Sequence, residues 1–205
     1  MWSDLRADSA VYAALRYPNS TGAILGVLIW LRSPGLLALA LYRARHALLL
    51  YRQRKGLTFT AIVLKVPLSL AKQLLIVLFK IDVHAAAVIA GGVYLSDRGE
   101  LILGPERIGS GTVIHERVTI GVKAGGDTGP VIGENVWIGP DCVIYGDISV
   151  GAGVTVLPGT VMSMNVPNDT VVGGNPATIV RRNFDNRYLR QTRSCNVDPH
   201  YLMQA

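Results

Sequence analysis

Two pairs of side chains in this chain could supply a general base. His115 and Glu116 are adjacent in the segment IHERVTIG, and imidazole is the usual base near neutral pH. Asp82 and Asp97 are carboxylates, and a lone aspartate is a weak base with a reference pKa of about 3.9. Two carboxylates held together in a dry interface would raise the apparent pKa of the pair, so that it could take a proton from a hydroxyl. Each of these residues also has a purely structural alternative. His115 and Glu116 could lie in a solvated turn, Asp97 could cap a turn, and Asp82 could accept hydrogen bonds from backbone amides.

Basic side chains in the second half of the chain suit a phosphate-bearing ligand. Arg181 and Arg182 can bind phosphate with bidentate geometry, although two arginines before a polar tail are also typical of solvated charge. Lys123, in the loop VKAGGDTGP, could reach the same ligand or an acceptor. The sequence lacks a dinucleotide glycine fingerprint and a cluster of metal-ligand residues, so we expect neither NAD nor a metal. The two cysteines, Cys142 and Cys195, lie far apart in the sequence and do not have the spacing of a disulfide framework, so we expect the protein to reside in a reducing compartment.

A repeat of six residues must position these side chains. From residue 108 to residue 156 an aliphatic anchor recurs every sixth position, with only the position of Gly126 missing. A small residue often follows the anchor, and a second apolar residue often stands four places after it. Each hexad predicts a short flat strand and a turn, whose apolar edge is buried only against the next coil. The sequence therefore predicts a parallel β-helix. Its anchors are Ile108, Ile114, Ile120, Ile132, Ile138, Ile144, Val150 and Val156.

Residues 1–80 form a different part, which is basic and helical. They hold eleven Lys and Arg against two Asp, a net charge of +9, whereas the other 125 residues carry −3. Leu- and Ala-rich runs predict helices that break near Pro34. The second helical run is amphipathic, and its apolar face suits packing between subunits or, as the alternative, basic helices lying on an anionic leaflet. The charge is not accompanied by a recognition motif or interleaved aromatics, so we expect no nucleic-acid partner.

Charged residues and prolines interrupt every apolar run of this part. Arg32, Pro34, Lys65, Pro67 and Lys72 do so before a run reaches about 20 residues, so a membrane span is not expected. The opening MWSDLRADSA carries two acidic residues before any apolar run, unlike a secretory signal. We therefore expect a cytoplasmic protein, with peripheral contact at the inner face of the membrane as an open alternative.

Six short motifs run through these parts in a fixed order: DLRADS at 4–9, YRARH at 42–46, IDVHAAAVIAGG at 81–92, VTIG at 118–121, GGD at 125–127 and GGNPATIVRR at 173–182. With these motifs the chain resembles the hexapeptide-repeat acyltransferases, in the branch of the serine acetyltransferases. The resemblance covers about residues 4–182, and colanic-acid-type exopolysaccharide O-acetyltransferases of that branch are equally similar. It implies a left-handed parallel β-helix at 81–182, after a helical part at 1–80 and before a polar tail at 183–205. It also implies acetyl-CoA as acyl donor, bound in grooves between the subunits of a trimer or a dimer of trimers.

The resemblance also assigns residues to the site. The base of serine acetyltransferases is a histidine in an Asp-His-Gly-Thr-Gly segment, supported by the aspartate of an Ile-Asp-Ile-His motif. Asp82 matches the supporting aspartate, but Ser96 and Asp97 stand at the segment's aspartate and histidine. Thr128 and Gly129 stand where the family has an arginine and a histidine that help to hold serine.

Three further positions follow from the same resemblance. Glu116 stands where family members often carry His or Gln. In the closing segment a glycine-rich bend, here Gly174, Asn175 and Pro176, lets the backbone approach the cofactor. The family's N-terminal Asp-Pro corresponds either to 17–18, which is Tyr-Pro here, or to Asp8.

These departures favour an acceptor other than serine. We predict an acetyl-CoA-dependent O-acetyltransferase that acts on a hydroxyl of a saccharide, in exopolysaccharide biosynthesis. The first alternative is a serine O-acetyltransferase that feeds cysteine biosynthesis. The second is a catalytically inactive β-helix that serves as an assembly protein.

Overall fold

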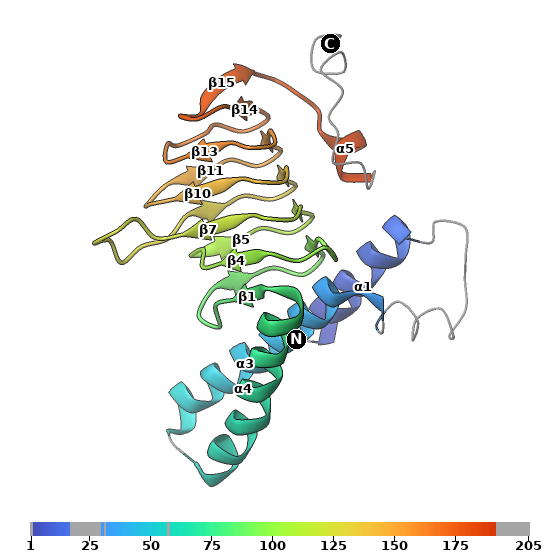
Figure 1. Cartoon of the computed structure of the whole chain (residues 1–205), viewed down its shortest axis with the longest axis vertical. Helices are drawn as coiled ribbons and strands as arrows, with labels where there is room; N and C mark the ends of the chain where they lie inside the picture. The colour runs from blue at the N-terminus through green and yellow to red at the C-terminus, as the bar shows by residue number, and fades with distance from the viewer. Residues whose placement is uncertain (1, 17–29, 31, 57, 192–205) are drawn as a thin grey trace.

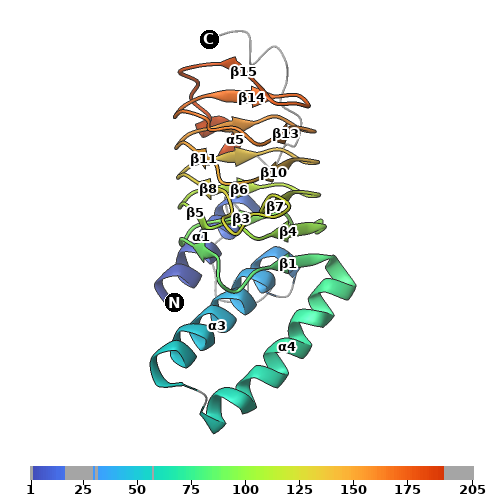
Figure 2. The same cartoon turned by 90° about the vertical axis from the view of Figure 1, so that its left-hand side faces the viewer.

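The structure is a computed structural model that describes residues 2–16, 30, 32–56 and 58–191. Three long helices, α1 (Trp2–Arg16), α3 (Pro34–Lys55) and α4 (Phe59–Phe79), precede a column of short strands. The helices lie at one end of the column and the last strands at the other (Figure 1). Helices α3 and α4 pack together as a hairpin that projects away from the column (Figure 2).

The column is a parallel β-helix whose successive coils add strands to three sheets. The sheets have the orders β1-β4-β7-β10-β13, β11-β8-β5-β2 and β15-β14-β12-β9-β6-β3. All the pairings within them are parallel except that of β14 with β15. The predicted left-handed β-helix after a helical part is confirmed. The strands are β1 (Ile81–Val83), β2 (Val88–Ile89), β3 (Tyr94–Leu95), β4 (Leu101–Leu103), β5 (Arg107–Ile108), β6 (Val113–Ile114), β7 (Thr119–Gly121), β8 (Val131–Ile132), β9 (Trp137–Ile138), β10 (Val143–Tyr145), β11 (Ser149–Val150), β12 (Thr155–Val156), β13 (Val161–Met162), β14 (Val171–Gly173) and β15 (Thr178–Arg181).

The hexads fill the inside of the column. None of the eight predicted anchors is more than 1% exposed. Ile132 pairs with Val150, 18 positions later, as a coil of three hexads requires. Ile108 pairs with Ile132 instead, 24 positions later. The additional six residues belong to an exposed loop at 122–128, which explains why the repeat misses position 126.

Glycine follows an anchor where stacked corners leave no room for a side chain. A Cβ atom on Gly109 would lie 2.5 Å from the backbone of Gly133, and one on Gly133 would lie 2.8 Å from the backbone of Gly151. Neighbouring coils therefore approach each other at these corners more closely than a residue with a side chain allows.

Helices α1 and α3 close the N-terminal end of the column. The Tyr42 hydroxyl, on α3, donates to the Ala87 carbonyl at 2.6 Å and accepts from the Ile89 amide at 3.1 Å. The Tyr12 hydroxyl, on α1, contacts the carbonyl and amide of Leu95 at the same two distances. Because β2 and β3 are the terminal strands of their sheets, their outward backbone groups need such partners once the helices bury them.

Removing one of these hydroxyls should destabilise the fold. Tyr42→Phe leaves a buried carbonyl and a buried amide unsatisfied, so we expect the free energy of unfolding to fall by about 1–3 kcal/mol. Urea denaturation followed by circular dichroism measures the change. Tyr51→Phe, at a side chain that is 42% exposed on the same helix, is the control and should change stability by less than about 0.5 kcal/mol. Equal effects of the two substitutions would contradict the capping role of Tyr42.

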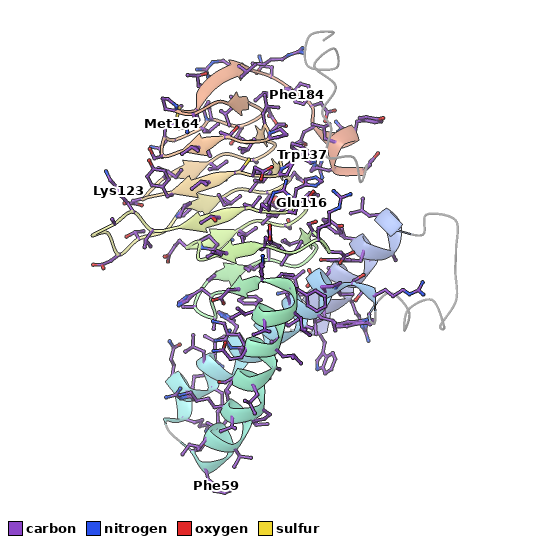
Figure 3. All side chains as sticks on the ribbon, viewed as in Figure 1. Phe59, Glu116, Lys123, Trp137, Met164 and Phe184 are labelled. Carbon is purple, nitrogen blue, oxygen red and sulfur yellow. The ribbon has the colours of Figure 1, made fainter. Side chains whose placement is uncertain are left out.

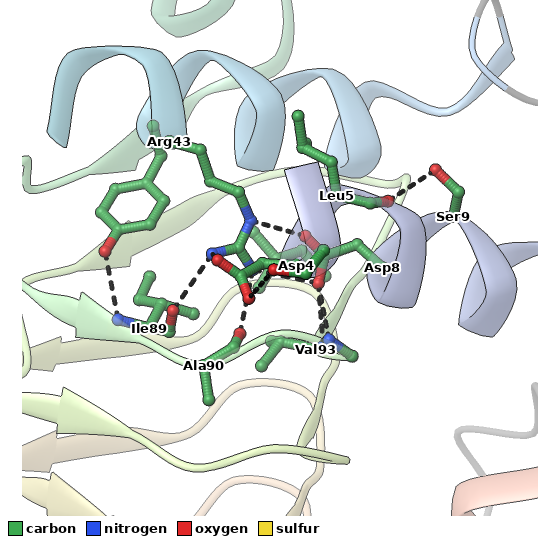
Figure 4. A network of polar contacts seen from close by, with 12 residues as sticks. Asp4, Leu5, Asp8, Ser9, Arg43, Ile89, Ala90 and Val93 are labelled. Carbon is green, nitrogen blue, oxygen red and sulfur yellow. Dashed lines mark hydrogen bonds and ion pairs between the residues drawn. The ribbon is translucent and has the colours of Figure 1, made fainter. Parts of the chain in front are cut away.

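A buried ion pair joins both helices to the first coil (Figure 4). Asp8, on α1, accepts from Nε and Nη2 of Arg43, on α3, at 2.8 and 3.1 Å. Asp8 also accepts from the amides of Gly92 and Val93. Arg43 in turn donates to the carbonyls of residues 89 and 90. The motifs DLRADS and YRARH therefore meet in space. We call the Asp8–Arg43 ion pair, with the backbone groups of the first coil that it contacts, the structural joint.

Helix α4 differs from its prediction. Pro67 was expected to interrupt the apolar run, but α4 continues through it to Phe79. Proline costs the helix its hydrogen bond to the carbonyl of Val63, and Val63 is 51% exposed, so water can solvate that carbonyl. By length and composition the segment Ala61–Phe79 is able to cross a membrane, and its apolar window is not buried against the rest of the protein.

The C-terminal segment returns to the side of the column. Phe184, Asn186 and Leu189 are buried, and Asn186 donates from Nδ2 to the carbonyls of Asn135 and Gly153. Helix α5 (Arg187–Gln191) follows. The first residues of the predicted polar tail thus pack on the β-helix, while residues 192–205, with Cys195, lie outside the described part.

Candidate active site

Polar side chains gather at one corner of the column, where the chain passes from the β3–β6 sheet to the β4–β7 sheet. Ser96 and Arg98 lie in the turn between β3 and β4, and His115 and Glu116 lie one coil further on, between β6 and β7. Ser96 Oγ donates to Glu116 Oε2 at 3.0 Å, and Arg98 Nη1 donates to Glu116 Oε1 at 2.8 Å. We call these four residues the corner cluster. Its stacking follows from the parallel pairing of β3 with β6.

Glu116 is an anion within this cluster. Its side chain is only 5% exposed. Burial opposes ionisation, but hydrogen bonds from Arg98, from its own backbone and from Ser96, with the charge of Arg98, lower the pKa of Glu116 to about 2. A carboxylate with that pKa holds charge near neutral pH and is a poor proton acceptor.

His115 is a neutral imidazole in the same cluster. It is 3% exposed, and its ring centroid lies 4.9 Å from that of Trp137. Burial lowers the pKa of His115 from 6.5 to about 4; Glu116 acts in the opposite direction and Arg98 adds to the lowering. Nδ1 of His115 lies 3.9 Å from Glu116 Oε2, so the anion would stabilise an imidazolium formed during proton transfer. The expected alternative of a solvated turn at His115 and Glu116 is wrong, because both side chains are buried.

Asp82 and Asp97 do not form the predicted carboxylate pair within this chain. Oδ1 of Asp82, on β1, lies 2.7 Å from Nζ of Lys72, on α4. Oδ1 of Asp97 accepts from the amide of Gly35, in the first turn of α3, at 3.3 Å. A helix N-terminus attracts negative charge, so Asp97 serves as a cap of α3. Asp82 lies on β1, whereas Asp97 lies in the turn between β3 and β4, and each carboxylate has a partner from a different helix.

The loop that holds Lys123 lies on the other side of the column. Figure 3 shows Lys123 and Glu116 on opposite sides, with the coil between them. Residues 122–128 are exposed. Gly129, which stands at a histidine of the family, is buried, and a Cβ atom there would lie 2.8 Å from the carbonyl oxygen of Gly104. A histidine at position 129 therefore requires a different backbone path. Because the loop and the corner cluster lie on opposite sides of the column, they do not form one site within a single chain.

The predicted phosphate-binding residues lie at the far end of the column. Gly174, Asn175 and Pro176 are exposed in the turn between β14 and β15. The guanidinium carbon of Arg181 lies 5.5 Å from the ring centroid of Phe184, which holds this arginine beside the returning segment. Arg182 follows on the exposed surface. These residues are separated from the corner cluster along the column axis.

Ser96, Arg98 and Trp137 were missed as contributors to the site. Ser96 and Glu116 are 20 positions apart, and a regular coil of 18 residues would not align them. The strands that lead into this corner, β3 and β6, pair at a separation of 19, as Leu95 does with Ile114. A first coil longer than 18 residues would have indicated that Ser96 faces Glu116, but the six-residue spacing alone does not reveal that length. Of the expected N-terminal alternatives, Asp8 belongs to the structural joint and 17–18 lies outside the described residues. Among the residues that the structure describes, no three His, Cys, Asp or Glu side chains converge as metal ligands.

Comparisons with known proteins agree on one family. A family model described as bacterial transferase hexapeptide (six repeats) matches residues 129–163. Soybean serine acetyltransferase, as apoenzyme, is 34% identical with a TM-score of 0.69, covering 87% of this chain and 68% of that one. The Neisseria gonorrhoeae serine acetyltransferase in complex with serine is 26% identical with a TM-score of 0.71, covering 88% and 69%. The Brucella abortus strain S19 enzyme in complex with coenzyme A is 26% identical with a TM-score of 0.70, covering 88% and 68%.

These matches contradict the predicted saccharide acceptor. The similar curated proteins and solved structures are serine acetyltransferases, so the predicted role in exopolysaccharide biosynthesis has no support and the serine alternative is the better supported one. The chain spans between 33% and 45% of the length of the curated relatives that it matches. The motifs, the β-helix and the soybean enzyme together place the chain: it belongs to the hexapeptide-repeat acyltransferase superfamily, in the serine acetyltransferase-like branch.

Proposed function

We propose that this protein transfers the acetyl group of acetyl-CoA to the hydroxyl of serine. The similar enzymes crystallised with serine and with coenzyme A support this acceptor and this donor. Within the chain, the observation that carries the proposal is the corner cluster, which holds a neutral imidazole beside a fixed carboxylate. Its turn is one coil away from Asp97, the position at which the family has its base.

The cluster supplies the proton transfer that this reaction needs. The serine oxygen attacks the thioester carbonyl carbon, and a base accepts the hydroxyl proton. The carbon–sulfur bond then breaks, and the same proton passes to the departing sulfur. We assign the base to His115, whose imidazolium Glu116 would stabilise, while Ser96 and Arg98 hold Glu116 in place. Serine must be held without the family's arginine and histidine, because Thr128 and Gly129 stand there.

The groove for acetyl-CoA requires a neighbouring chain. The 122–128 loop with Lys123 and the corner cluster lie on opposite sides of one column, so a threefold arrangement would bring the loop of one subunit toward the cluster of the next. We therefore propose a homotrimer, in which Lys123 and the Arg181–Arg182 pair bind the phosphates of the donor. Light scattering of the purified chain measures its mass.

Release of CoA, followed with a thiol reagent, tests this function. We expect CoA to appear faster with L-serine than without it and O-acetylserine to form in equal amount. His115→Ala should lower kcat at least about 100-fold, the usual minimum for loss of a general base. His84→Ala, at an exposed histidine after β1, is the control and should retain activity.

Other results have distinct meanings. Full activity of His115→Ala would move the base elsewhere while leaving the serine acceptor intact. Saturable acetyl-CoA binding without a response to serine would overturn the acceptor. No binding of acetyl-CoA at all would favour the inactive assembly protein.

A further inference from the structure

The outward face of helix α4 is apolar along its whole length. Seven large apolar side chains are between 51% and 81% exposed; six of them follow one another at steps of three or four residues, and the seventh, Leu78, comes four residues after Leu74. On a helix this spacing places them on one face. Figure 3 shows Phe59 at the free tip of the hairpin, from which the face extends back toward the column. The residues, which we call the α4 face, are Phe59, Val63, Val66, Leu70, Leu74, Val77 and Leu78.

The charges of α4 lie on its inner side. Lys72 contacts Asp82 on the column. Lys65 lines a shallow cavity between the two helices of the hairpin, together with Arg45 and Arg52 of α3. A helix on the surface of a soluble domain normally turns its apolar residues inward and its charges outward. Helix α4 has the reverse orientation, so its outward face is built for an apolar environment.

Cations lie at the tip end of this face, and acidic residues are absent from its neighbourhood in the chain. No Asp or Glu occurs between Asp8 and Asp82. Arg52, Arg54 and Lys55 occupy the last turn of α3, at the tip of the hairpin. An apolar face bordered by Lys and Arg is the pattern of helices that lie in the interface of an anionic bilayer.

We propose that the α4 face docks on the anionic phospholipid leaflet of a membrane, with the column standing away from it. A second copy of the chain is the other occupant to consider. Symmetric contact of two α4 faces would bring the cations of both hairpins close together, and no Asp or Glu between residues 8 and 82 is available to neutralise them. Anionic headgroups complement the same cations. The helix lies in the interface and does not span the bilayer, because α3 packs along it with five Arg and Lys and β1 follows it directly.

Flotation of the purified full-length chain with vesicles tests the docking. The vesicles consist of phosphatidylcholine alone or with about one third phosphatidylglycerol. We expect flotation with the anionic vesicles at low salt and its loss as salt screens the attraction. Leu70→Asp/Leu74→Asp should abolish flotation. Val88→Asp, at a 51% exposed valine on β2, is the matched control and should float as the wild type does.

A charge variant separates the electrostatic part from the apolar part. Arg54→Ala/Lys55→Ala should weaken partition to anionic vesicles by about fivefold for each cation removed. Circular dichroism of each variant establishes that it is folded, and light scattering gives its mass. An unbound wild type at low salt, equal flotation with both kinds of vesicle, or flotation of the folded Leu70→Asp/Leu74→Asp variant would overturn docking of the α4 face on an anionic leaflet. Wild type that stays off vesicles, with a mass that falls in that variant, would assign the α4 face to a second copy.

Discussion

Asp8→Ala is expected to lower the free energy of unfolding by about 3–5 kcal/mol, which is the usual cost of breaking a buried ion pair by removing one partner. Asp8 is 0% and Arg43 5% exposed, so water cannot replace the lost carboxylate. The substitution also removes the acceptor of the Gly92 and Val93 amides. Denaturation in urea, followed by far-ultraviolet circular dichroism, measures the loss.

Asp4→Ala is the matched control for this prediction. Asp4 lies on the same helix, 3.7 Å from the same arginine, but its side chain is 39% exposed. An exposed ion pair contributes less than about 1 kcal/mol because water screens it. A similar decrease in the free energy of unfolding for Asp8→Ala and Asp4→Ala would contradict the claim that the buried ion pair fastens α1 to the column.

Acidification should destabilise the fold through the corner cluster. The pKa of His115 falls from 6.5 to about 4 on folding, so between these values the unfolded chain binds a proton that the folded chain does not. Stability from this group is therefore present above pH 6.5 and is lost as the pH falls toward 4, by about 3 kcal/mol over the whole window. Glu116, with a pKa lowered from 4.5 to about 2, continues the loss below pH 4.5.

His115→Gln isolates the upper part of this dependence. The variant cannot take up the proton, so its free energy of unfolding should fall much less than that of the wild type between pH 7 and pH 4.5. Urea denaturation at a series of pH values gives both curves. His84→Gln, at an exposed histidine, is expected to follow the wild-type curve. Parallel curves for His115→Gln and the wild type would contradict the buried, neutral state of His115.

The fold was predictable because its determinants are periodic and local. A coil of 18 residues needs an aliphatic side chain at every sixth position and a small residue where corners stack, and both patterns are visible in the chain. The missing repeat at Gly126 also had a local cause, the loop at 122–128. The family motifs were visible for the same reason, since each is a short run of residues. The acceptor was predicted wrongly because it was inferred from side chains that are absent, among them the family's arginine and histidine, in whose places Thr128 and Gly129 stand.

The sequence by itself determined the β-helix, the basic helical part and the family. Only the tertiary structure decided what the candidate residues contact: Asp97 caps α3, Asp82 meets Lys72, and Glu116 receives Ser96 and Arg98. It also decided that the apolar face of α4 turns outward. The physical reason is that periodicity reports which side chains share a face, whereas partners depend on coil lengths and helix docking. Residues 20 or 35 positions apart, such as Ser96 and Glu116 or Asp8 and Arg43, meet only through the assembled fold.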